Sequence, residues 1–312
     1  MTLDAAARRR LGRALTRLAN ASVEEILALA ADEPGTRARR IGVTGPPGAG
    51  KSSLVGRLAT LRSQSAGASG AESAGIGVLA IDPTSPRSGG AILGDRIRMD
   101  ELAGARDLYV RSLASRTAAD GLADNLPELL AAMDAAGFDE VLVETVGVGQ
   151  VEHAVRSLVE TLVLVTVPES GDFVQAMKAG LVELADLIVV NKADLPGAAR
   201  TAAEIRRALH LAPTSREGHA TPVLLASIQD AASIAALSAA IDERQRSFVG
   251  RTREGQRTER ARYRLKSLLE RRAAEIVRGL PDEAFDRPLA RQYAQATGVF
   301  DTAARVTQLA PT

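Results

Sequence analysis

Short apolar runs alternate with helix-compatible segments along most of the chain. The runs that predict buried strands lie at residues 41–43, 76–81, 108–111, 141–144, 162–167, 187–190 and 223–225. The segments between them carry apolar residues at helical spacing, at residues 54–58, 95–103, 122–136, 173–184, 199–209 and 234–241. Strands that alternate with helices pair in parallel and bury both faces of their sheet under helices. The pattern therefore predicts an α/β fold with a doubly wound, mainly parallel sheet.

Helical patterns also flank this alternating region. Before it, apolar residues from Leu11 to Leu18 recur at helical spacing opposite a run of arginines, which is typical of a solvated helix face. After it comes an Arg/Glu-rich helical pattern with one narrow apolar stripe. We expect a helical extension at residues 1–40, a nucleotide-binding domain at 41–247 and a C-terminal helical region at 248–312. Residues 63–75, rich in small and polar side chains, are predicted to form a flexible loop. The stripe residues are Leu265, Leu268, Leu269 and Ile276.

Composition narrows the function classes. The formal net charge of +1 gives no overall basic field, so we expect no nucleic acid partner. The absence of cysteine excludes disulfides, thiolate metal sites and cysteine nucleophiles. No apolar run has the length of a membrane span, so no membrane partner is expected. These features favour a cytoplasmic protein, and the Arg-rich start is expected to belong to the first helix rather than to a targeting sequence.

A glycine-rich stretch connects the first predicted strand to the first predicted helix. It reads GPPGAGKS over residues 45–52 and matches the G-x-x-x-x-G-K-[ST] pattern of a phosphate-binding loop. Glycines let the backbone point successive N–H groups at a phosphate, Lys51 adds a positive charge, and Ser52 offers a hydroxyl to Mg²⁺. The following helix directs its positive end at the same anion. The expected phosphate contacts are Gly45, Pro46, Pro47, Gly48, Ala49, Gly50, Lys51, Ser52 and Ser53.

The base is expected to be read by NKAD at residues 191–194, directly after a predicted strand. Asp194 can accept hydrogen bonds from N1–H and N2–H₂ of guanine, whereas adenine has an acceptor at N1 and lacks the N2 amine. A site whose polar groups would stay unpaired rejects the wrong ligand by roughly 10⁴-fold. The competing interpretation, Asp194 as a helix N-cap, leaves the upstream phosphate-binding loop unexplained. The expected guanine contacts are Asn191, Lys192, Asp194, Ser227 and Ile228.

The sequence ETVG at residues 144–147 ends another predicted strand, where GTPases carry D-x-x-G. Glu144 can hold the Mg²⁺ shell, and the Gly147 N–H can sense the γ-phosphate. The next residue is Val148, which has no polar group to orient the attacking water, whereas Ras-like proteins have glutamine there. We therefore expect slow hydrolysis by the chain alone. The candidate catalytic groups are Lys51, Asp82, Gly147 and Gln150, with Arg87 as a further candidate.

Four motifs together make the chain resemble the MeaB/ArgK family of GTPases. They are GPPGAGKSSL over residues 45–54, IDPTSPRSGGAILGDRIRM over 81–99, ETVGVGQVE over 144–152, and NKAD. The resemblance implies a GTPase of the signal-recognition and MinD class that acts as a chaperone of an adenosylcobalamin-dependent acyl-CoA mutase, typically methylmalonyl-CoA mutase. It also implies a homodimer held partly by C-terminal helices. The Mg²⁺ ligands that it implies, direct or through water, are Ser52, Asp82, Asp95 and Glu144.

The chain departs from the family pattern in three places. Residues 117–123 read TAADGLA where the family tends to have more glycine, so a loop beside a switch can differ in mobility. The base-covering loop at 227–231 reads SIQDA instead of S-A followed by glycines, so its contact with guanine can differ too. The C-terminal region matches the family only in being helical.

Other functions are compatible with parts of the sequence. A kinase linked to amino-acid transport would need a second pocket with a catalytic base, and no separate motif for one is visible. A metal-insertion GTPase would need clustered cysteines and histidines, but His153, His210 and His219 are scattered. A further alternative is a nucleotide-regulated scaffold protein that hardly hydrolyses its nucleotide. An RNA-associated GTPase using residues 251–278 is disfavoured, because acids interrupt the arginines and Tyr263 alone could stack on a base.

Overall fold

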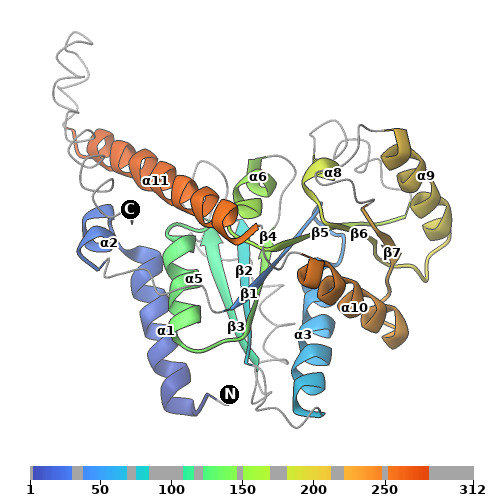
Figure 1. The fold of residues 1–312 in the computed structure, drawn as a ribbon. Coiled ribbons are helices and arrows are strands. Elements are labelled where there is room, and N and C mark those ends of the chain that lie inside the picture. Colours follow the sequence, from blue (N-terminus) through green and yellow to red (C-terminus); the bar gives the residue numbers. More distant parts are fainter. Residues whose placement is uncertain are drawn as a thin grey trace.

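A seven-stranded parallel sheet forms the centre of the molecule (Figure 1). The computed structural model describes residues 3–29, 38–68, 75–83, 108–115, 122–145, 150–168, 181–211, 221–247 and 252–280. The strand order is β3-β2-β4-β1-β5-β6-β7, and every recorded pair is parallel. This confirms the predicted doubly wound α/β fold. The strands are β1 (Arg39–Thr44), β2 (Ile76–Pro83), β3 (Leu108–Ser115), β4 (Glu140–Thr145), β5 (Thr161–Thr166), β6 (Leu187–Val190) and β7 (Val223–Leu225).

Helices cover both faces of the sheet, because the central strands carry apolar side chains on each of the two faces. On one face, Val43 of β1 and Val163 of β5 pack with α3 (Lys51–Ala68) and α10 (Ala231–Ser247). On the other face, Val143 and Leu162 pack with α1 (Ala5–Asn20), α5 (Leu126–Ala135) and α6 (Gln150–Arg156). That second face continues across β6 to α8 (Leu181–Leu184) and α9 (Ala198–Leu211).

The strand order fixes where a ligand can bind. β1 lies between β4 and β5, so the chain leaves β1 toward β2 on one side and later reaches β5 on the other. In open parallel sheets, ligands bind outside the carboxyl ends of the strands where the order reverses. The loop after β1 therefore occupies the topological switch point of this sheet.

A buried ion-pair network holds α3 against the sheet and against α10. Glu140, at the start of β4, has a fully buried side chain, and the Arg62 guanidinium contacts both of its carboxylate oxygens at 2.5 and 2.7 Å. The same guanidinium reaches Asp242 of α10 at 2.7 Å. Arg62 thus links β4, α3 and α10, and α3 is the helix that follows the phosphate-binding loop.

The two helical extensions pack against each other. Helix α11 (Thr252–Arg278) crosses α2 (Val23–Leu29), and Leu268 is buried against Val23 and Ile26, with Leu265 beside it. Part of the C-terminal apolar stripe, which the family resemblance made a candidate for the dimer contact, is thus covered within the chain. The apolar surface left for a second copy is smaller than the sequence indicated.

Several predicted segment boundaries differ from the structure, most clearly at the end of α3. Residues 63–68, predicted as the start of a flexible loop, continue α3 to Ala68, with the Ser63 hydroxyl donating to the Thr60 carbonyl at 2.9 Å. Alanine and serine fit a helix interior when the preceding turn is already formed, so small residues alone do not end it. The predicted helix at 95–103 and most of the one at 173–184 lie outside the described residues.

Candidate functional site

The loop between β1 and α3 has a backbone that glycine alone adopts without strain. Gly45 has a φ of 145°, and a Cβ there would lie 2.1 Å from the Val165 carbonyl oxygen of β5. Gly50 has a φ of 79°, and a Cβ there would lie 2.7 Å from Nδ2 of Asn191. The two glycines let the loop lie directly against β5 and against the segment that follows β6.

Lys51 opens α3 with a buried side chain that turns back over the loop. Its ammonium donates to the carbonyl oxygens of Gly45 at 2.9 Å and Pro46 at 2.8 Å. The positive charge therefore lies inside the loop, next to the N-terminus of α3, where a phosphate would meet both. Pro46 and Ala49 are buried, Ser53 is half-buried, and Pro47 and Gly48 are exposed.

Ser52 and Glu144 lie in direct contact. The Ser52 hydroxyl donates to Oε1 of Glu144 at 2.6 Å, and the Glu144 carboxylate at the end of β4 is buried. A hydroxyl and a carboxylate at the mouth of a phosphate loop are hard oxygen donors of the kind that Mg²⁺ prefers. These two residues therefore fit a Mg²⁺ site, although their roles as ligands stay predictions.

The remaining predicted catalytic and metal residues are less fully described. Asp82 is the next-to-last residue of β2, and Gln150 is the first residue of α6, but their side chains lie outside the described part of the structure. Asp95 and Gly147 lie outside the described residues altogether, as do Arg87 and Val148. Among the described residues, no group of three or more metal-ligating side chains occurs.

The NKAD segment sits on the phosphate loop. The Asn191 amide donates through Nδ2 to the Ala49 carbonyl at 2.8 Å, and the Lys192 ammonium donates to the Gly48 carbonyl at 2.9 Å. Lys192 has a φ of 56°, a left-handed conformation that is uncommon outside glycine and asparagine. The residues expected to read the base thus hold the loop expected to bind the phosphates. Sequence reasoning missed this contact, which joins residues 142 positions apart.

Asp194 lies exposed beside the loop that follows β7. The Ser227 hydroxyl donates to its Oδ1 at 2.6 Å, and this hydrogen bond lowers the pKa of Asp194 below its usual value. A carboxylate with a lowered pKa stays ionised at neutral pH, as an acceptor of two guanine N–H groups must. Ser227 is buried and Ile228 is exposed, and the guanine contacts expected of both stay predictions. No helix starts at Asp194, because α9 begins at Ala198.

The chain is similar to proteins named as GTPases. A Pyrococcus abyssi protein named as a GTPase is 48% identical over 171 residues, which are 55% of this chain and 51% of that protein. The GTPase ArgK of Escherichia coli is 43% identical over 155 residues, 50% of this chain and 45% of that protein. The chain therefore spans about half the length of these curated relatives.

A solved structure and a family model extend the likeness beyond that half. A crystal structure titled LAO/AO transport system kinase superposes with a TM-score of 0.58 at 24% identity, covering 99% of this chain and 98% of that one, which supports the fold. None of the described helices is long and apolar enough to cross a membrane. The family model described as methylmalonyl-CoA mutase-associated GTPase MeaB matches residues 11–280. The chain belongs to the MeaB family.

Proposed function

We propose that this chain binds and slowly hydrolyses GTP with Mg²⁺, and that it acts as a nucleotide-dependent chaperone of an adenosylcobalamin-dependent acyl-CoA mutase. The observation that supports it most is the seating of the NKAD segment on the phosphate loop through Asn191 and Lys192. With these contacts, a nucleotide whose phosphates lie in the loop would bring its base to Asp194. Residues 41–247 would form the GTPase domain, flanked by helical extensions at 1–40 and 248–312.

Each group in this proposal has a chemical task. Lys51 would neutralise charge on the β- and γ-phosphates, and Asp194 would select guanine. Mg²⁺, when bound, neutralises charge on the phosphate oxygens. Ser52 and Glu144 would hold it, with Asp82 and Asp95 as further ligands, direct or through water. The residue directly after the ETVG sequence is Val148, which has no polar group to orient water, so the chain alone would hydrolyse slowly.

The proposal that the partner is a mutase rests on the family description, which names methylmalonyl-CoA mutase. A slow GTPase with polar groups on segments near the phosphates is suited to control by a partner, because the partner can supply or move one such group. Removal of about 3 kcal/mol from the barrier would accelerate hydrolysis roughly a hundredfold. A homodimer is also part of the proposal, with an interface that includes parts of α11 that α2 leaves uncovered.

Single-turnover GTP hydrolysis, with and without methylmalonyl-CoA mutase, tests this proposal. A rate on the order of 10⁻³ s⁻¹ for the protein alone corresponds to a barrier of about 21 kcal/mol. We expect that rate to rise clearly when the mutase is added, with Lys51→Ala inactive in both conditions. Fast turnover by the isolated protein would refute the argument from Val148, and a rate unchanged by the mutase would count against the chaperone role.

A further inference from the structure

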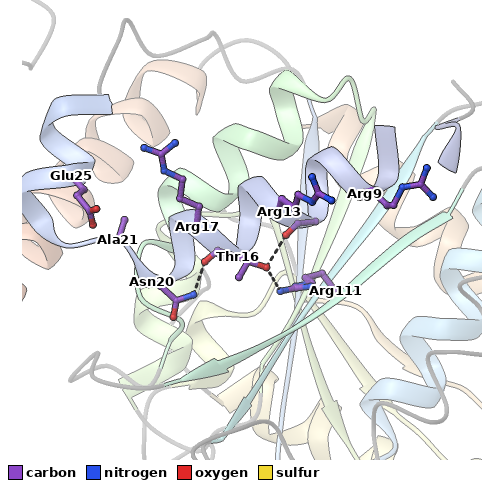
Figure 2. Close-up of a pocket in the computed structure, with 9 residues that line it drawn as sticks. Arg9, Arg13, Thr16, Arg17, Asn20, Ala21, Glu25 and Arg111 are labelled. Atoms are coloured by element: carbon purple, nitrogen blue, oxygen red, sulfur yellow. Dashed lines mark hydrogen bonds between the residues drawn. The ribbon is translucent and has the colours of Figure 1, made fainter. Parts of the chain in front are cut away.

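An open hollow of about 620 Å³ lies between α1 and the neighbouring strand β3 (Figure 2). Arginines dominate its wall: Arg9, Arg13 and Arg17 come from α1, and Arg111 comes from β3. We call these four residues the arginine face. Helix α1 contains five arginines and no acidic residue. The other residues that line the hollow are Gly12, Thr16, Asn20, Ala21 and Glu25.

Three of the five arginines of α1 form a ladder along the helix. Arg9, Arg13 and Arg17 are four residues apart and all exposed, so their Cα atoms follow one another in steps of about 6 Å. Like charges at this spacing destabilise a helix. The buried positions of α1, Leu11 and Leu15, explain why the helix packs on the sheet but give no reason for a ladder of one sign.

One carboxylate in the described part of the chain, that of Asp4, interacts electrostatically with Arg9 of the ladder, but no ion pair between them is recorded. None of the ladder arginines has a recorded ion pair there, whereas Arg264 of α11 pairs with Glu128 and Arg272 pairs with Glu24. Glu25, which lines the hollow, is engaged in a capping box. Its Oε2 accepts from the Ser22 N–H at 2.8 Å, and its own N–H donates to the Ser22 hydroxyl at 3.2 Å.

Arg111 is held in place beside the ladder. Its Nη2 donates to the Thr16 hydroxyl at 2.7 Å, and that hydroxyl donates to the Gly12 carbonyl at 2.8 Å (Figure 2). The Nε of Arg111 is buried and has no acceptor among the described residues. A guanidinium fixed in the wall of the hollow adds a fourth positive charge beside the ladder.

The residues that line the hollow favour an acidic protein segment over nucleic acid or a bilayer. No aromatic residue lines it, so it offers no stacking surface for nucleic acid bases. No large apolar side chain lines it that could enter a bilayer. Guanidinium groups form two parallel hydrogen bonds with a carboxylate, and Asp or Glu four residues apart on a helix recur at the same spacing as the ladder.

We propose that the arginine face docks an acidic helix of a partner protein, one with carboxylates at four-residue spacing. The docking surface and the acidic character of the partner helix are inferred from the residues of the arginine face alone. The further identification of that partner as the mutase rests on the proposed function.

Fluorescence anisotropy with a labelled alanine-based helical peptide, glutamate at every fourth position, tests the surface directly. Arg13→Glu/Arg17→Glu inverts two charges of the ladder, and Arg57→Glu/Arg207→Glu makes the same change at exposed positions of α3 and α9. We expect the first variant to bind about tenfold more weakly, the control to bind like the unmodified protein, and added salt to weaken binding. Arg13→Gln/Arg17→Gln repeats the test if the inverted variant loses its helical circular dichroism.

Three results would overturn the proposal. One is a protein that does not bind the peptide, and another is an equal loss in both variants. The third is a preference for single-stranded DNA or phosphatidylserine vesicles over the peptide.

The same variants, titrated with methylmalonyl-CoA mutase, separate the surface from the proposed function. If the unmodified protein binds the mutase and the ladder variant binds about tenfold more weakly, the mutase is a partner of the arginine face. If both bind equally, the arginine face is not the mutase docking site, although the chaperone role stands. If neither binds, the chaperone role fails, and the peptide result alone decides the docking surface.

Discussion

Replacement of Asn191 tests the contact that joins the base-reading segment to the phosphate loop. The Asn191 side chain is buried, and its Nδ2 donates to the Ala49 carbonyl at 2.8 Å. Asn191→Ala removes the donor, whereas Asn191→Asp keeps the shape and turns the donor into an acceptor. The two variants therefore separate the loss of a hydrogen bond from the creation of a repulsive contact.

The structure sets the expected size of each effect. A buried carbonyl that loses its donor costs about 1–3 kcal/mol of unfolding free energy. Asn191→Ala also removes Oδ1, which is buried without a partner among the described residues, so the net cost should be about 1 kcal/mol. Asn191→Asp places a charge against a carbonyl oxygen in a buried site, for which about 3–5 kcal/mol is expected. For a domain of this size, about 1 kcal/mol lowers the Tm by roughly 2–4 °C.

Thermal unfolding followed by circular dichroism measures both variants, and calorimetry with GDP shows whether the loop is disturbed. Asn20 supplies the control, because its Nδ2 donates to the Thr16 carbonyl at 2.6 Å on an exposed surface. Asn20→Ala and Asn20→Asp should change stability by less than about 0.5 kcal/mol. The reasoning is refuted if Asn191→Asp melts at the same temperature as the unmodified protein, or if Asn191→Ala is the more damaging change.

Three further predictions concern the phosphate-binding loop, the recognition of guanine and the buried ion pair between Arg62 and Glu140. Lys51→Ala should weaken GDP binding about a hundredfold or more, because the phosphates lose the lysine charge inside the loop, and unchanged affinity by calorimetry would exclude the loop as the phosphate site. Asp194→Asn should weaken GDP and admit xanthosine diphosphate, since an amide can donate to the 2-oxo group; an unaltered base preference would mean that NKAD does not read the base. Arg62→Met should lower the unfolding free energy, measured in urea, by about 3 kcal/mol, because the buried Glu140 carboxylate keeps only a weaker contact with Arg39 at 3.3 Å among the described residues. A loss below about 1 kcal/mol would contradict this.

The fold was readable from the sequence because its central strands are short, mostly buried apolar runs. The runs at 187–190 and 223–225 match β6 and β7 residue for residue. Boundaries were less predictable where local composition and tertiary packing disagree. Residues 63–68 look like a loop because their side chains are small and polar, yet they continue a helix whose preceding turns are fixed by the packing of Leu54 and Leu58.

A candidate site could be proposed from the sequence where one short motif carries all the chemistry, as in GPPGAGKS and NKAD. The contacts between these motifs were not, because a bond such as Lys192 to Gly48 depends on the neighbouring positions of β1, β5 and β6 in the sheet. The arginine ladder shows the same limit. Its spacing is visible in the sequence and predicted a solvated face, but the fixed Arg111 beside it became apparent with the packing of β3 on α1.

Competition for a fluorescent GDP analogue tests most directly the central claim that this edge of the sheet binds a guanine nucleotide. Unlabelled GDP, ADP and xanthosine diphosphate are titrated against the bound analogue in the presence of Mg²⁺. The account predicts that GDP displaces it at a concentration roughly 10⁴-fold lower than ADP, because Asp194 would face an acceptor at N1 of adenine. Displacement by ADP at the same concentration as GDP would contradict the account.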